Sequence, residues 1–174
     1  MTKAKLLQPD FVLGKTIIHL HPDLLQRYRL KGLVLDVDET LVPFSEPDVS
    51  PELEQWVAEI RPQMPIWLVS NNLSEARIGR IAQSLDLPFL FGAAKPSRRK
   101  LRQAIDQMGL EVASVAMVGD RLFTDVLAGN RLGMFTILVE PMVLGDARHP
   151  RLSIRNVEVW ISSLLGVTLQ HSQH

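Results

Sequence analysis

The chain has 174 residues, of which 46% are apolar and 22% are charged, proportions typical of one globular domain with a sizeable core. Nineteen basic and nineteen acidic residues give a formal charge of zero, so we expect no nucleic-acid partner. The absence of cysteine excludes disulfides and thiolate metal sites. No apolar run approaches the roughly 20 residues of a membrane-spanning helix, and the N-terminus lacks a signal peptide's apolar core. We therefore expect a cytoplasmic protein, with any membrane contact peripheral.

Short β-rich runs alternate with segments of helical period along the chain. The predicted strands are residues 32–36, 65–70, 88–91, 114–119 and 134–140. The predicted helices are residues 52–61, 74–85, 98–108 and 124–132, the third capped by Ser97. Because nearly continuous apolar strands are each followed by a helix, the pattern favours a parallel sheet covered on both faces. We predict an α/β fold, a doubly wound parallel sheet of five strands.

The parts outside this alternation are assigned by position. Residues 31–167 are predicted to form the α/β domain, residues 168–174 a short tail, and residues 1–30 an N-terminal extension. The apolar segment 11–20 of that extension is too short to span a bilayer. It would either pack on the edge of the domain or lie in a membrane interface.

Polar side chains gather where the predicted strands end, which is where doubly wound sheets bind their ligands. The residues at or just after these ends are Asp36, Asp38, Thr40, Ser70, Asn71, Lys95, Asp120 and Asp125. Carboxylate oxygens suit Mg²⁺, whereas a hydroxyl, a lysine and backbone N–H groups suit phosphate. A bound cation would explain why two carboxylates end a buried strand, where like charges otherwise repel.

The two aspartates of the first strand end also suit phosphoryl transfer. Asp36 at the strand tip can attack phosphorus as a covalent nucleophile. Asp38 lies two residues further on, so in an extended chain it projects to the same side. From there it can protonate the leaving oxygen and later activate water.

This arrangement resembles the haloacid dehalogenase (HAD)-like phosphatase superfamily, whose four motifs occur here in order within residues 32–125. The motifs are Asp36-Val-Asp38-Glu-Thr40, then Ser70, then Lys95, and finally Gly119-Asp120 with Asp125. The resemblance implies that the catalytic residues are Asp36, Asp38, Thr40, Ser70 and Lys95, with Thr40 orienting Asp38 or its loop. It implies that phosphate is held by Ser70, Asn71 and Lys95, and Mg²⁺ by Asp36, the Asp38 carbonyl and Asp120. Asp125 would support the metal site and Lys95 without coordinating the metal itself.

The spacing of the motifs leaves no room for a large cap domain. Only 29 residues separate Thr40 from Ser70, and only 24 separate Ser70 from Lys95. An uncapped site is open, which suits phosphate carried on something large, such as a lipid headgroup, a protein, a nucleic acid end or a polysaccharide.

Residues 69–72 and 119–131 look like the YqeG-like branch of HAD subfamily IIIA, which includes the organellar phosphatidylglycerophosphate phosphatases. Glu39 is a departure, because relatives often carry a small or amide residue there. The branch implies a Mg²⁺-dependent phosphomonoesterase that converts phosphatidylglycerophosphate to phosphatidylglycerol, a step of lipid metabolism. The alternatives are a soluble phosphate, a nucleic acid or protein phosphoester as substrate and, least favoured, a non-catalytic binding protein.

Several of these residues also have ordinary structural interpretations. Ser70 could cap the next helix, Lys95 could be a solvated loop lysine, and Asp125 could cap the helix that follows Thr124. Another open case is the basic cluster at 98–102, whose members are Arg98, Arg99, Lys100 and Arg102. It forms either a solvated helix face or a contact for an anionic headgroup. The sequence does not indicate an oligomeric state.

Overall fold

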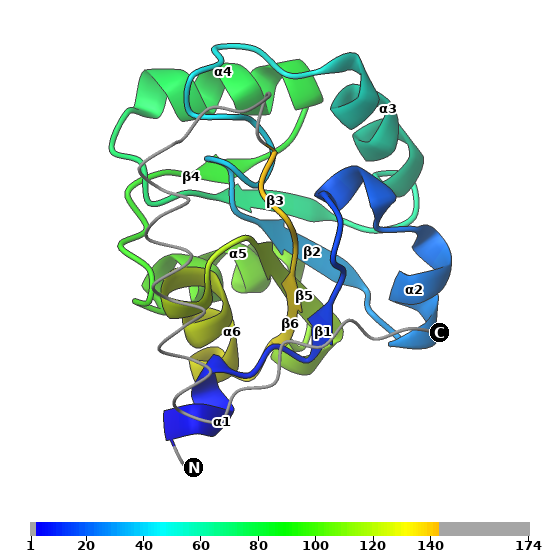
Figure 1. Ribbon diagram of the computed structural model, residues 1–174, viewed down its shortest axis with the longest axis vertical. Helices are drawn as coiled ribbons and strands as arrows, with labels where there is room; N and C mark the ends of the chain where they lie inside the picture. Colours follow the sequence, from blue (N-terminus) through cyan, green and yellow to red (C-terminus); the bar gives the residue numbers. More distant parts are fainter. Residues whose placement is uncertain (1–2, 143–174) are drawn as a thin grey trace.

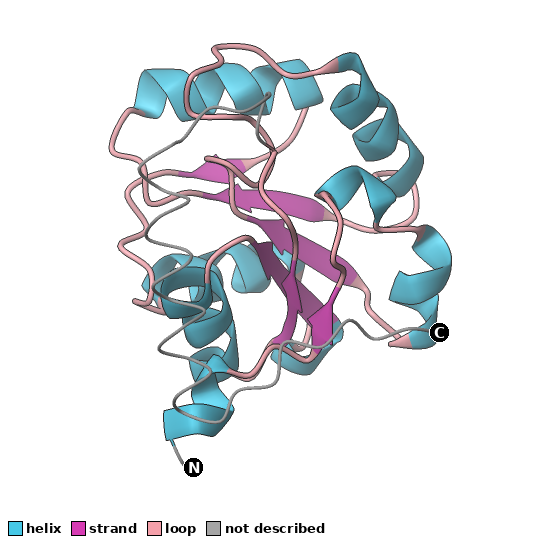
Figure 2. Ribbon diagram, in the orientation of Figure 1, coloured by secondary structure: helices cyan, strands magenta, loops and turns pink. Residues whose placement is uncertain are grey.

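The computed structural model describes residues 3–142, which form a parallel sheet between two layers of helices (Figures 1 and 2). The strands are β1 (Phe11–Val12), β2 (Gly32–Leu35), β3 (Ile66–Val69), β4 (Phe89–Leu90), β5 (Val115–Gly119) and β6 (Phe135–Leu138). Their order in the sheet is β1-β6-β5-β2-β3-β4, and all neighbours are parallel. The predicted doubly wound α/β class is confirmed, with six strands rather than five.

The helices are α1 (Lys3–Leu7), α2 (Pro22–Arg27), α3 (Pro51–Ile60), α4 (Glu75–Leu85), α5 (Arg99–Met108) and α6 (Leu127–Leu132). Figure 1 shows α3 and α4 on one side of the sheet and α5 and α6 on the other. Strand β2 serves both sides, because successive side chains of a strand point to opposite faces. Leu33 and Leu35 belong to the core under α3 and α4, whereas Val34 belongs to the core under α5 and α6.

The sixth strand, β1, comes from the N-terminal extension. Phe11 pairs with Ile137 and Val12 with Leu138 of β6. Two residues are too few to produce a recognisable alternation, and this strand exists because β6 offers it a partner 126 positions away. The apolar segment 11–20 thus packs on the edge of the domain, one of the two alternatives that the sequence left open.

Two helix starts differ from the prediction. Arg98, not Ser97, is the N-cap of α5, and its side chain makes no capping bond. The segment predicted as one helix from 124 begins with a π-helical turn, Leu122–Val126, before α6. Such turns concentrate at functional sites. The predicted domain end at 167 and the tail 168–174 lie outside the described residues.

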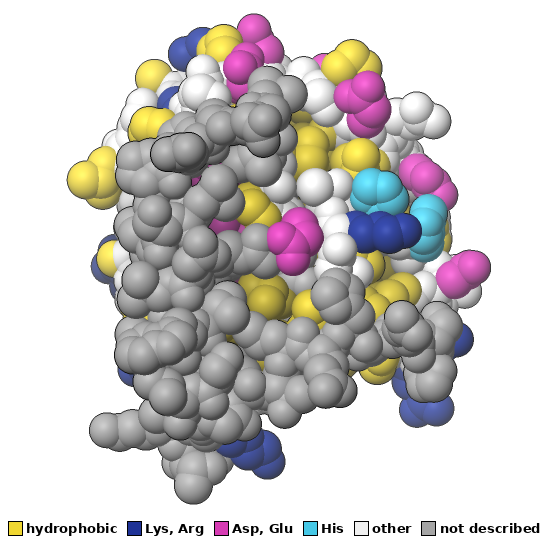
Figure 3. Space-filling model, in the orientation of Figure 1, with side chains coloured by type: hydrophobic (Ala, Val, Ile, Leu, Met, Phe, Trp, Pro, Cys, Tyr) yellow, Lys and Arg dark blue, Asp and Glu magenta, His cyan; other side chains and the backbone are white. Residues whose placement is uncertain are grey.

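Part of one face shows the mixed charges that the balanced composition predicts. On the face that Figure 3 shows, acidic and basic side chains of the described residues are interspersed among apolar and uncharged ones. Within residues 3–142, no helix is both long enough and apolar enough to cross a bilayer.

Candidate active site

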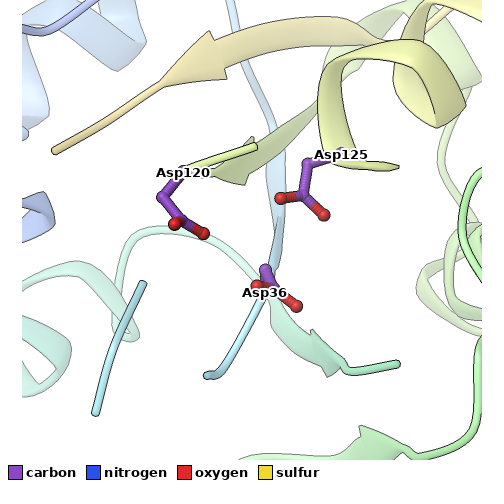
Figure 4. Close-up of side chains that lie close together, drawn as sticks. All are labelled: Asp36, Asp120 and Asp125. Atoms are coloured by element: carbon purple, nitrogen blue, oxygen red, sulfur yellow. The ribbon is translucent and has the colours of Figure 1, made fainter. Parts of the chain in front are cut away.

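Three buried carboxylates meet at the carboxyl ends of two central strands. Asp36 follows β2, Asp120 follows β5, and Asp125 lies on the π-helical turn after β5. One carboxylate oxygen from each lies within 4.8 Å of the others, and all three residues are buried. Figure 4 shows the three side chains directed toward a common point. These residues are called the carboxylate cluster below.

Lys95 is the cation of the cluster. Its Nζ lies 2.6 Å from Asp36 Oδ1 and 2.7 Å from Asp125 Oδ1, and it donates a hydrogen bond of 2.9 Å to the Val69 carbonyl. Burial would lower the pKa of Lys95, but the carboxylates of Asp125 and Asp36 outweigh it, so that its pKa is raised. Lys95 is therefore a buried, charged lysine and not a solvated loop residue.

Burial also has the largest effect on the pKa of Asp36. Loss of solvent raises its pKa from 3.8 to about 6, the proximity of Asp125 adds to the rise, and Lys95 opposes it. The carboxylate cluster thus carries negative charge that one lysine does not relieve, which is a reason for a cation to bind there.

Asp38 points away from the carboxylate cluster toward α4. Its Oδ2 accepts hydrogen bonds from Asn72 Nδ2 at 2.9 Å and from the Ser70 hydroxyl at 3.5 Å. Its Oδ1 accepts from Arg77 Nε at 3.1 Å. The two carboxylates therefore have different partners: Asp36 pairs with Lys95, and Asp38 pairs with Arg77.

Arg77 and Asn72 were not among the residues singled out from the sequence. Besides Asp38, Arg77 binds the carbonyls of Glu46 at 2.6 Å and Pro43 at 3.1 Å, and its guanidinium lies 5.4 Å from the centre of the Phe44 ring. It thereby ties Asp38 to residues 41–49, the loop after the first motif. No motif marks Arg77, because its contacts lie 31 to 39 positions away in the chain.

Thr40 contacts different carboxylates from the one predicted. Its hydroxyl donates to Asp120 Oδ1 at 3.0 Å and to Asp36 Oδ2 at 3.4 Å, not to Asp38. The reason is the turn at Glu39, which has a left-handed backbone (φ 69°) and brings Thr40 back over the strand tip. The buried Glu39 side chain accepts the Phe44 N–H at 3.0 Å and so stabilises this loop.

Ser70 and Asn71 lie at the end of β3 with distinct contacts. Ser74, not Ser70, caps α4, so the capping interpretation of Ser70 is wrong. The Ser70 hydroxyl accepts from the Asn72 N–H at 3.0 Å and faces Asp38. The Asn71 side chain accepts the Lys95 N–H at 2.7 Å and donates to the Lys95 carbonyl at 3.1 Å. The Asn71 side chain therefore fixes the Lys95 loop, and a phosphate contact at Asn71 would have to come from its backbone N–H.

Asp125 packs against the backbone of Gly119. A Cβ on Gly119 would clash with the Asp125 side chain, which would have to shift. The Asp125 Oδ2 accepts the Arg121 N–H at 3.2 Å, which fixes the start of the π-helical turn. The N-cap of α6 is Val126, which makes no side-chain capping bond, so the interpretation of Asp125 as a helix cap is wrong; Asp125 instead supports Lys95.

A cavity of about 350 Å³ opens over these groups. Its lining residues are Asp36, Asp38, Phe44, Ser70, Asn71, Asn72, Leu73, Lys95, Arg121 and Thr124. Phe44 is 45% exposed and Leu73 is 83% exposed, so the cavity has an apolar rim. Between the first and the third motif, residues 41–94 hold only α3, β3, α4 and β4, and no cap domain.

The residues present fit a divalent cation. The carboxylates of Asp36 and Asp120 offer hard oxygen ligands, the type that Mg²⁺ and related cations prefer, while the oxygens of Asp125 contact Lys95 and the Arg121 N–H. The Asp38 carboxylate is not one of the three, so a metal role for Asp38 would use its backbone carbonyl.

Comparisons with known proteins agree with this site. The family model described as HAD-hydrolase-like matches residues 92–159. The chain is 37% identical over 166 residues to the "probable phosphatase YqeG" of Bacillus subtilis, covering 95% of this chain and 94% of the relative. It is 26% identical over 154 residues to the chloroplastic/mitochondrial phosphatidylglycerophosphate phosphatase 1 of Arabidopsis thaliana, covering 83% of this chain but 44% of the relative.

A solved structure supports the fold. The cobalt-bound deoxy-D-mannose-octulosonate 8-phosphate phosphatase of Haemophilus influenzae aligns with a TM-score of 0.51 at 12% identity, covering 78% of this chain and 91% of that one. The chain belongs to the HAD-like hydrolase family and is an HAD-type phosphatase.

Proposed function

We propose that this phosphatase hydrolyses phosphomonoesters through an aspartyl-phosphate on Asp36, with Mg²⁺ as its metal. The observation that carries the proposal is the position of Asp36, whose carboxylate lines the cavity, faces Asp120 and Asp125, and touches Lys95 at 2.6 Å. Asp36, Asp120 and the Asp38 carbonyl would hold the metal. When bound, Mg²⁺ would offset the clustered negative charge and polarise the phosphoryl group.

Asp38 is proposed as the acid and then the base. An oxygen of Asp36 attacks phosphorus while the bond to the leaving oxygen breaks, and that oxygen takes the proton of Asp38. Water then attacks the aspartyl-phosphate, gives its proton to Asp38, and releases phosphate and free Asp36. Arg77 and Asn72 hold the Asp38 carboxylate at the cavity wall for both transfers.

The transferring phosphoryl group is proposed to bind Ser70, the Asn71 backbone and Lys95. Ser70 and Lys95 are buried at the cavity floor, where hydrogen bonds to charged oxygens are strongest. Thr40 would position Asp36 and Asp120, and Asp125 would hold Lys95 in place.

For the substrate we propose phosphatidylglycerophosphate at a membrane surface. The similarity to the Arabidopsis phosphatase supports this choice, although the chain spans under half of that protein. The rim of the cavity supports it independently. Among the described residues three large apolar side chains are exposed, and two of them, Phe44 and Leu73, border this cavity. An apolar rim suits a substrate whose phosphate is attached to a lipid.

The test is a substrate panel with Mg²⁺. Turnover of p-nitrophenyl phosphate separates an enzyme from a non-catalytic binding protein. Phosphatidylglycerophosphate in vesicles is expected to be hydrolysed far faster than glycerol phosphate, nucleotides or sugar phosphates. If a soluble phosphate were hydrolysed faster than the lipid, that class of soluble phosphate would be the substrate in place of phosphatidylglycerophosphate.

A matched pair of variants tests the rim. Leu73→Gln is expected to slow the vesicle reaction several-fold, because it removes apolar contact with the lipid, and Leu73→Met is expected to leave it unchanged. Both variants should retain p-nitrophenyl phosphate turnover. An equal loss in both variants would assign Leu73 to the fold.

A further inference from the structure

A second charged hollow lies outside the catalytic cavity, between α5 and α6. Its volume is about 590 Å³, and its lining residues are Ser97, Arg98, Arg99, Arg102, Arg131 and Leu132. Three of the arginines come from the start of α5, and Arg131 comes from the last turn of α6. Figure 1 shows these helices on the same side of the sheet, and they contact each other. We call this feature the arginine hollow.

Backbone contacts fix two of the four guanidinium groups. Arg98 Nη1 donates to the Arg131 carbonyl at 3.1 Å, and Arg131 Nη1 donates to the Pro96 carbonyl at 3.1 Å. Each guanidinium has five N–H donors, so these bonds orient the groups and leave donors for a ligand. The hollow is thus a folded arrangement in which residues 33 and 35 positions apart are hydrogen-bonded.

Within residues 3–142 the four arginines have no carboxylate partner. None of the four forms an ion pair with a carboxylate of residues 3–142, although the whole chain has as many acidic as basic residues. Arg98 and Arg102 stand four apart and Arg99 and Arg102 three apart on α5, spacings at which like charges repel. The described part of the chain therefore places positive charge without a carboxylate partner around a concave surface.

The start of α5 adds to this charge. The first turn of α3 contains Glu52 and Glu54 and that of α4 contains Glu75, which complement the positive end of a helix. The first turn of α5 has no acidic residue, and the Ser97 hydroxyl accepts the Arg99 N–H only at a long 3.5 Å. Arginines there oppose the helix dipole, so a bound anion would relieve both repulsions.

We propose that the arginine hollow binds a phosphate group, carried by an anionic lipid headgroup or free in solution. Arginine matches phosphate because its planar N–H pairs bond two oxygens at once. The four guanidinium groups surround one hollow without an aromatic side chain on which a base could stack, which favours phosphate alone over single-stranded nucleic acid. The site is separate from the catalytic cavity, so it does not depend on the mechanism proposed for Asp36.

The test is a pair of double variants with the same change of charge. Arg99→Gln with Arg102→Gln removes two of the four guanidinium groups and leaves intact the backbone hydrogen bonds that Arg98 and Arg131 make. The control is Arg80→Gln with Lys100→Gln: Arg80 is exposed on α4, and Lys100 lies 5.8 Å from the centre of the Phe91 ring. Neither pair touches the catalytic groups, so both should retain p-nitrophenyl phosphate turnover with Mg²⁺.

Two probes separate the sources of phosphate. In the first, the protein is sedimented with vesicles of phosphatidylcholine alone or mixed with phosphatidylglycerol. Wild type and the control should bind the anionic vesicles, and the hollow variant should bind them about 25-fold more weakly, at about fivefold per arginine near an anionic surface. In the second, inorganic phosphate is titrated into ¹⁵N-labelled protein, and the amide signals of residues 97–102 and 131 should shift.

The outcomes decide the proposal. If only the hollow variant loses vesicle binding, the ligand is a lipid headgroup. If inorganic phosphate shifts the amide signals but the protein does not bind vesicles, the ligand is a free phosphate. Equal loss in both variants would mean that diffuse charge, not the hollow, binds anions and would overturn the proposal. Absence of both vesicle binding and localised shifts, or binding of a single-stranded oligonucleotide in their place, would also overturn it. Failure of catalysis changes none of these readouts.

Discussion

The carboxylate cluster and the arginine hollow show two opposite ways of placing charge. In the cluster the charges are buried and opposite charges touch, with Lys95 between Asp36 and Asp125. In the hollow four exposed charges of one sign have no carboxylate partner among residues 3–142. Buried charge must be paired because water cannot solvate it, whereas exposed charge is free to remain single. The comparison predicts that the cluster governs chemistry and stability, and that the hollow governs contact with a ligand.

The largest effect is expected from the nucleophile. Asp36→Asn should lower turnover of p-nitrophenyl phosphate by roughly a thousandfold or more, because an amide does not form the acyl-phosphate. Circular dichroism of the same sample should show an intact fold. Activity within about tenfold of wild type, on the order of 1.4 kcal/mol of barrier, would contradict the covalent role of Asp36.

Removal of the metal should have a comparable effect. Treatment with EDTA is expected to abolish turnover, and Mg²⁺ should restore it. Ca²⁺ should inhibit, because its larger and looser coordination shell misplaces the nucleophile. The measurement is an initial rate in demetallated buffer with each ion added back. Full activity of the demetallated protein would refute the metal role of Asp120.

Lys95→Met tests the buried side of the comparison. It leaves the carboxylates of Asp36 and Asp125 without their cation and should destabilise the metal-free protein by about 3–5 kcal/mol. Urea unfolding followed by circular dichroism measures this change. A loss below about 1 kcal/mol would show that these carboxylates are neutral or solvated in the folded protein.

Gly119→Ala should have a smaller effect. The added methyl group would lie 2.4 Å from Asp125 Cγ, so Asp125 must move away from Lys95. We expect destabilisation of about 1–3 kcal/mol, as for other overpacked sites, together with reduced turnover. The same unfolding and rate assays apply. An unchanged rate would show that the position of Asp125 does not matter for catalysis.

The smallest effect on stability is expected in the arginine hollow. Arg99→Gln with Arg102→Gln should change the melting temperature by no more than about 2 °C, because both side chains are exposed and unpaired. Differential scanning calorimetry measures this shift. A fall of about 10 °C would mean that the hollow serves the fold, and the contrast with the carboxylate cluster would disappear.

The sequence predicted most of the scaffold, because strands and helices follow local patterns. The five predicted strands appear within one or two residues of their expected ends, and the strand-end residues from Asp36 to Asp125 converge as the parallel topology requires. What it missed depends on distant partners. Strand β1 forms because it pairs with β6. The role of Arg77 depends on its bonds to the loop 41–49, and that of Arg131 on its contact with Arg98 at the start of α5. No local pattern encodes such contacts.

The short outer strands have a consequence for how copies of this protein meet. Within residues 3–142, both edges of the sheet, β1 and β4, contain two residues each. An edge of this length presents few unpaired backbone groups, so it gives a second chain little to pair with. The long central strands β2 and β5 are flanked on both sides and remain inaccessible. Extension of the sheet from one molecule into the next is thereby discouraged, which protects the protein from edge-to-edge aggregation at high concentration.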